Sequence, residues 1–114
     1  MLVPRMGAIL PERVVFAART PLCYRVVLAR NRWREIVRFK HPALRDRDED
    51  LIRCVEDPDI IRESVKDPNV HLLYRREGEL FLCVVAAPSA GEDRFVVTAY
   101  VTRNIKQGNT LWTK

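Results

Sequence analysis

The segment DRFVVTAYVTRN, residues 93–104, has the two-residue alternation of a β-strand, and its two faces differ in chemistry. One face is apolar and carries Phe95, Val97, Ala99 and Val101. The other carries a cation and hydroxyl groups: Arg94, Thr98, Tyr100 and Thr102. We predict that the apolar face packs against helices. The polar face indicates either a phosphate-binding surface, since these groups donate hydrogen bonds, or a half-exposed strand with high β-propensity.

The rest of the chain predicts an antiparallel meander that includes this strand. Strands are expected at 60–65, 69–76, 79–87 and 93–104, separated by Asp-Pro, Glu-Gly and Pro-Ser-Ala-Gly turn signals. Two further strands are expected at 13–21 and 24–29. The predicted fold is therefore α+β, with two helices packed on a four-stranded antiparallel sheet plus N-terminal strands.

The two helices are predicted between these groups of strands. The first follows Asn31 as N-cap and ends near residue 40, because Pro42 restricts His41 to extended conformations. Its apolar face carries Trp33, Ile36 and Val37, and its basic face carries Arg30, Arg34 and Arg38. The second spans residues 45–58 and buries Leu51, Ile52 and Val55.

Length and charge narrow the class of protein. The 114 residues predict one domain, 1–114, in which residues 1–12 form a flexible leader because two prolines and a glycine oppose regular structure. Residues 1–40 have a net charge of +7, residues 41–93 of −6 and residues 94–114 of +4. This segregation favours a phosphate-bearing partner such as RNA, and the alternative is a bipolar protein with no nucleic-acid role.

The sequence lacks the features of several other classes of protein. The three cysteines form no CxxC pair and are typical of reduced thiols in a cytoplasmic protein. Prolines and charges interrupt the N-terminal apolar runs, so we expect no signal peptide, and no segment has the roughly 18 apolar residues of a membrane span. No nucleotide-binding, metalloprotease or hydrolase motif is present. We expect no cofactor, no metal and no membrane partner.

Few residues are candidates for acid–base chemistry. His41 is expected at a helix C-terminus, where the helix dipole favours its protonated form, although a lone histidine is more often structural. His71 is expected within a strand, and we interpret it as structural or exposed. Arg75 and Arg76 alternate along one strand, so only one of them can contribute to a given site.

Two motifs resemble those of a known protein family. The first is Trp-x-x-Ile-x-x-x-x-His-Pro at 33–42, and the second is the Thr-Ala-Tyr strand followed by Ile-Lys-x-Gly-x-x-x-Trp at 105–112. Together with the intervening strands, residues 24–112 resemble small bacterial and phage members of the barnase–EndoU–colicin–RelE-like (BECR) nuclease superfamily. The resemblance implies a RelE-like fold and a metal-independent ribonuclease, commonly a toxin of a toxin–antitoxin system with RNA as substrate and an antitoxin protein as partner.

The resemblance also implies roles for individual residues. His41 would act as acid or base, with Thr98, Tyr100 and Arg75 completing the catalytic group. RNA phosphates would be bound by Arg76, Arg34, Arg38 and Lys106. Ala43 stands where relatives commonly have Glu, so a non-catalytic RNA-binding or protein-binding module of the same fold is the alternative.

Overall fold

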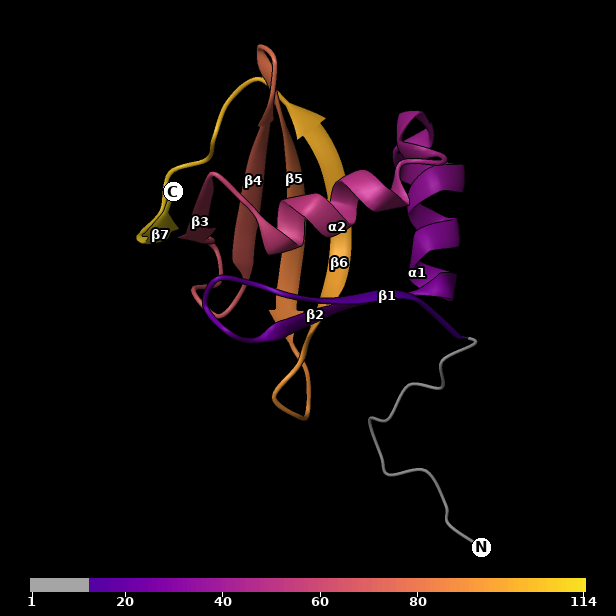
Figure 1. Ribbon diagram of the computed structural model, residues 1–114, viewed down its shortest axis with the longest axis horizontal. Helices are drawn as coiled ribbons and strands as arrows, with labels where there is room; N and C mark the ends of the chain where they lie inside the picture. The colour runs from indigo at the N-terminus through magenta and orange to yellow at the C-terminus, as the bar shows by residue number, and fades with distance from the viewer. Residues whose placement is uncertain (1–12) are drawn as a thin grey trace, which may run out of the picture.

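A computed structural model describes residues 13–114, which form an α+β fold with one seven-stranded mixed sheet (Figure 1). The predicted leader, residues 1–12, lies outside the described residues. The strands are β1 (Val14–Arg19), β2 (Arg25–Ala29), β3 (Ile60–Glu63), β4 (His71–Glu77), β5 (Leu80–Pro88), β6 (Arg94–Thr102) and β7 (Thr110–Thr113). Their order in the sheet is β1-β2-β6-β5-β4-β3-β7.

The sheet is larger than the four strands predicted. The antiparallel meander β3–β4–β5–β6 is confirmed, but it does not stand alone. The β1–β2 hairpin joins it because β2 pairs in parallel with the start of β6, at Val26–Arg94 and Val27–Phe95. At the other edge β7 pairs with β3. Strand β7 was not predicted, since four residues are too few for a recognisable alternation.

The helical segments lie between β2 and β3. They are α1 (Arg30–Glu35), the π-helical η2 (Ile36–Lys40), the 3₁₀ turn η3 (Pro42–Leu44) and α2 (Asp48–Glu56). The prediction of Asn31 as N-cap was wrong, because the helix begins at Arg30 with Ala29 as its N-cap. The predicted end at His41 is confirmed, with an extended φ of −139° before Pro42. Among residues 13–114, neither helix is long and apolar enough to cross a membrane.

The helices cover one face of the sheet, which we call the helix face. Figure 1 shows α2 crossing in front of the central strands and α1 standing beside β6. The main core joins helix residues Ile36, Leu51 and Val55 to strand residues Leu73, Leu82, Val84 and Ala99. Trp33, Val37 and Ile52 pack at its margin, as their helical spacing predicts.

The opposite face of the sheet, which we call the far face, has a smaller core of its own. Leu72, Tyr74 and Cys83 are buried there, with Tyr100 and Ile105 packed against them. Because Ile105 lies in the connection between β6 and β7, that connection folds back over the far face. A sheet buried on both faces explains why the strands of the meander are so apolar.

A β-bulge divides β6 into two parts whose faces differ. Thr98 pairs with Val85 and Val96 pairs with Ala86, so Val97 is the extra residue on the bulged strand. The predicted apolar face is therefore confirmed at Ala99, which is fully buried, and wrong at Phe95, which is 37% exposed. Val101 lies on the same face as Ala99 but is 36% exposed. Val96 takes the inward position in the first part of the strand.

Candidate functional site

Three side chains predicted for the site come together on the far face. The His41 ring lies 6.1 Å from the Tyr100 ring, centroid to centroid, and the Lys106 Nζ lies 5.6 Å from the Tyr100 ring centroid. Their positions are fixed by different elements. His41 ends η2, Tyr100 belongs to β6, and the Lys106 backbone N–H donates to Tyr74 Oη at 3.1 Å.

The π-helical turn places His41 at this position. The His41 N–H donates to the Ile36 carbonyl at 2.6 Å, which is the five-residue spacing of a π-helix. Residues after Ile36 are therefore rotated relative to their positions in a straight α-helix. Single π-helical turns are frequent at functional sites.

The hydroxyl groups of β6 also lie on the far face. Thr98 pairs with Val85 and Tyr100 with Cys83, so both side chains project opposite the helices. Three buried side-chain polar atoms have no hydrogen-bond partner among the described residues: Arg62 Nε, Thr98 Oγ1 and Tyr100 Oη. Arg62 pairs with Leu72 and shares this face. Buried polar atoms without a partner are uncommon in folded proteins, and a catalytic role or a bound water or ion is among the explanations for them.

Tyr100 is held as a neutral phenol. Burial raises its pKa well above the ordinary value of 10.0, and the neighbouring Cys83 and Tyr74 raise it further. Burial likewise raises the pKa of the Cys83 thiol to about 12. Tyr100 therefore carries its proton at neutral pH and offers it as a hydrogen-bond donor.

His41 and Lys106 are the groups of this site that can exchange protons or balance negative charge. The ring nitrogens of His41 have no hydrogen-bond partner within residues 13–114, and its side chain is half-buried. Lys106 forms no ion pair with a described carboxylate. The imidazole could transfer protons to and from a substrate, and the ammonium could balance the negative charge of a phosphate group.

The predicted arginines are not all at this site. Arg75 was expected to join Thr98 and Tyr100, but it pairs with Leu82 on the helix face and donates to the Asp57 carboxylate at 3.0 Å. Arg76 lies on the far face, where its guanidinium stacks on the Phe81 ring at 5.6 Å. Because successive side chains of a strand point to opposite faces of the sheet, Arg75 and Arg76 cannot share a site.

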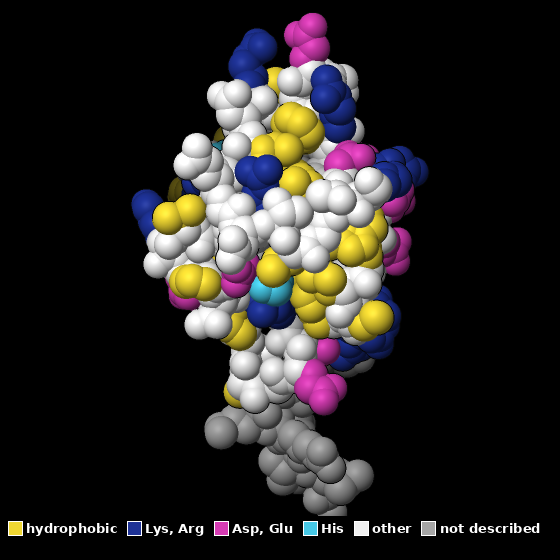
Figure 2. All heavy atoms as spheres, turned by 90° about the vertical axis from the view of Figure 1, so that its left-hand side faces the viewer, with side chains coloured by type: hydrophobic (Ala, Val, Ile, Leu, Met, Phe, Trp, Pro, Cys, Tyr) yellow, Lys and Arg dark blue, Asp and Glu magenta, His cyan; other side chains and the backbone are white. Residues whose placement is uncertain are grey.

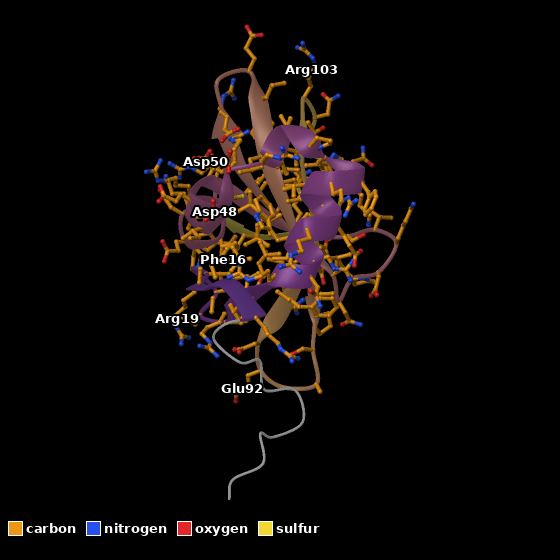
Figure 3. The ribbon with its side chains drawn as sticks, turned by 90° about the vertical axis from the view of Figure 1, so that its right-hand side faces the viewer. Phe16, Arg19, Asp48, Asp50, Glu92 and Arg103 are labelled. Carbon is orange, nitrogen blue, oxygen red and sulfur yellow. The ribbon has the colours of Figure 1, made fainter. Side chains whose placement is uncertain are left out.

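The remaining predicted cations lie outside this cluster. Arg34 and Arg38 are exposed on the helical segment before His41, and the Arg38 guanidinium stacks on Phe39 at 5.2 Å. Arg103 comes directly after β6 and begins the connection that contains Lys106. Figure 3 shows Arg103 and Glu92 at opposite ends of the molecule. Figure 2 shows basic side chains spread over the face seen from the β7 side, with hydrophobic side chains between them.

His71 belongs to a separate cluster on the helix face. Tyr24 Oη lies 2.7 Å from His71 Nδ1, and the Arg94 guanidinium lies 4.9 Å from the centre of the Tyr24 ring. The pKa of His71 is lowered to about 4, chiefly by burial and secondarily by Arg94, while Glu63 opposes the change. A neutral histidine tied to a phenol favours the structural interpretation of His71.

Metal-ligating side chains do not gather in the part of the chain that the structure describes. Within residues 13–114, no three His, Cys, Asp or Glu side chains are grouped so that they could hold a metal ion. Cys54 and Cys83 are buried free thiols, and Cys23 is an exposed one. Comparisons with protein-family models, with curated proteins and with solved structures each gave no match.

Proposed function

We propose that this protein is a metal-independent ribonuclease in which the 2′-OH of RNA is the nucleophile and His41 is the acid and base. The strongest support for this proposal is that the His41 ring and the Lys106 ammonium both lie close to the Tyr100 ring. The resemblance to BECR nucleases implies the same residues. Because such nucleases are commonly toxins, we further propose a cytoplasmic toxin restrained by an antitoxin protein.

The proposed reaction needs one proton removed, one proton returned and charge balanced at phosphorus. Neutral His41 accepts the proton of the 2′-OH, the 2′-oxygen forms a bond to phosphorus, and the bond from phosphorus to the 5′-oxygen breaks. The imidazolium then returns a proton to the departing 5′-oxygen. Lys106 balances the charge that grows on the phosphoryl oxygens, and the hydroxyls of Thr98 and Tyr100 donate hydrogen bonds to them.

Cleavage of labelled RNA by the purified protein in excess EDTA tests this proposal. We expect products ending in a 2′,3′-cyclic phosphate and no cleavage of DNA, which lacks the 2′-OH. His41→Ala should lower kcat/KM by about 10²–10⁴-fold, the usual contribution of general acid–base catalysis. His71→Gln is the matched control and should cleave RNA normally at pH 7.5, because His71 lies on the helix face. Equal cleavage of DNA, or activity unchanged in His41→Ala, would contradict the mechanism.

A non-catalytic module of the same fold is the second candidate. Ala43, within η3, is exposed and stands where the resembling nucleases have Glu, so one polar group of the family is missing here. This candidate predicts salt-dependent RNA binding through Lys and Arg without cleavage. Binding that is equal in wild type and His41→Ala, with intact RNA recovered from both, would favour it over the ribonuclease.

A further inference from the structure

A pocket of about 300 Å³ opens next to the candidate catalytic group. It is lined by Ser64, Val65, Lys66, Leu72, Lys106 and Gln107. Lys106 belongs to both places, since its Nζ lies over the Tyr100 ring and its side chain lines the pocket. A ligand that reaches from the pocket to His41 therefore passes Lys106.

The walls of the pocket are two loops that the structure holds together. At Gly108, φ is +151° and a Cβ would lie 2.0 Å from the Glu63 carbonyl oxygen, so only glycine allows this approach. Arg62 Nη1 donates to the Lys106 carbonyl at 2.9 Å, and Asn109 Nδ2 donates to the Glu63 carboxylate at 3.0 Å. Because these contacts fix both loops, the pocket is formed before any ligand binds.

The lining combines apolar side chains with a few polar groups. The apolar lining consists of Leu72, which is 4% exposed, and Val65, which is 72% exposed. The Gln107 side-chain amide has no hydrogen-bond partner among the described residues, so its donor and acceptor are both available. Lys66 and Lys106 also line the pocket and bring two positive charges to it.

This combination suits one class of ligand. A nucleobase has flat apolar faces that fit between Leu72 and Val65, and a polar edge that an amide can recognise by paired hydrogen bonds. The phosphates on either side of a base carry the charges that Lys66 and Lys106 would neutralise. An apolar peptide side chain would leave the Gln107 amide unused.

We propose that this pocket binds the nucleobase next to the scissile phosphate of RNA, and that Gln107 determines which base is preferred. The proposal rests on the proposed ribonuclease function for the position of the phosphate. It goes beyond that function by assigning substrate specificity to residues outside the His41–Tyr100–Lys106 group.

The test uses four fluorescein-labelled RNA hexamers that differ only in one central nucleotide. kcat/KM is measured for wild type, Gln107→Ala, Val65→Ala and the control Asn31→Ala, which changes an exposed amide on α1. Wild type should prefer one nucleotide. Gln107→Ala should reduce the ratio between the best and worst hexamer about tenfold and leave cleavage of the worst hexamer within about twofold, because only the recognised base loses hydrogen bonds. Asn31→Ala should retain the wild-type ratio.

A binding experiment separates failure of this proposal from failure of the ribonuclease. Dissociation constants of the same hexamers are measured by fluorescence anisotropy for wild type and for Gln107→Ala, each combined with His41→Ala. If RNA is cleaved but the base preference is absent, or persists in Gln107→Ala, the pocket assignment is overturned and the ribonuclease stands. If no RNA is cleaved, base-dependent binding that Gln107→Ala abolishes supports the pocket, and binding that it leaves unchanged overturns it.

Discussion

Mild acid should destabilise this protein through His71. The pKa of His71 in the folded protein is about 4, below its ordinary value of 6.5, chiefly because of burial and secondarily because of Arg94. As the pH falls, the unfolded chain therefore takes up this proton first. The stabilisation is complete above pH 6.5 and is lost progressively between pH 6.5 and 4.

The structure sets the size of the effect. At about 1.4 kcal/mol per pH unit, the interval from 6.5 to about 4 gives an upper bound of about 3.5 kcal/mol. Since His71 is only half-buried, solvent screening reduces the expected loss to about 1–2 kcal/mol. Ion-paired Asp57 and Asp93 act at lower pH, because their pKa values are lowered from 3.8 and their stabilisation is lost only as the pH falls through those values.

Urea unfolding followed by tryptophan fluorescence at pH 7.5, 6.5, 5.5 and 4.5 measures this loss. His71→Gln keeps an acceptor for the Tyr24 hydroxyl but cannot be protonated, so most of the pH dependence in this range should disappear. His41→Gln removes the other histidine, leaves the Tyr24–His71–Arg94 contacts in place and serves as control. The reasoning is refuted if His71→Gln loses as much stability as wild type between pH 6.5 and 4.5.

Two further substitutions have distinct expected outcomes. In a urea titration, Gly108→Ala should lower the free energy of unfolding by about 2 kcal/mol or more, because φ is +151° and the new methyl group would collide with the Glu63 carbonyl. Gly78→Ala is the control, since φ is +63° but the space around it is open, and it should lower the free energy of unfolding by about 1 kcal/mol. Tyr100→Phe removes a buried hydroxyl that makes no hydrogen bond of good geometry, although Cys83 and Tyr74 lie beside it, so the free energy of unfolding should change by less than about 1 kcal/mol, while RNA cleavage should fall about 10- to 100-fold. Loss of stability together with activity in Tyr100→Phe would indicate a structural role for the hydroxyl.

Local patterns in the sequence were sufficient for most elements of the fold. The meander β3–β6 and the two helices follow from alternation, helical spacing and the Asp-Pro and Glu-Gly turns, all of which act over a few residues. The missed features depend on distant segments. β7 exists because β3 has a free edge, and the parallel pairing of β2 with β6 depends on where the helices return the chain. The π-helical turn before His41 was likewise hidden, because its residues also suit an α-helix.

The bulge at Val97 explains why the candidate site was only partly predictable. A strict alternation along residues 93–104 groups Arg94 with Thr98 and Tyr100, whereas the extra residue sends Arg94 to the helix face and keeps the two hydroxyls on the far face. The single strand therefore serves two purposes. In its first part Arg94 contacts Tyr24 and adds to the effect of burial in lowering the pKa of His71, and its second part places the Tyr100 ring beside His41. The cation of the site is supplied instead by Lys106, which the connection after β6 carries back over Tyr100.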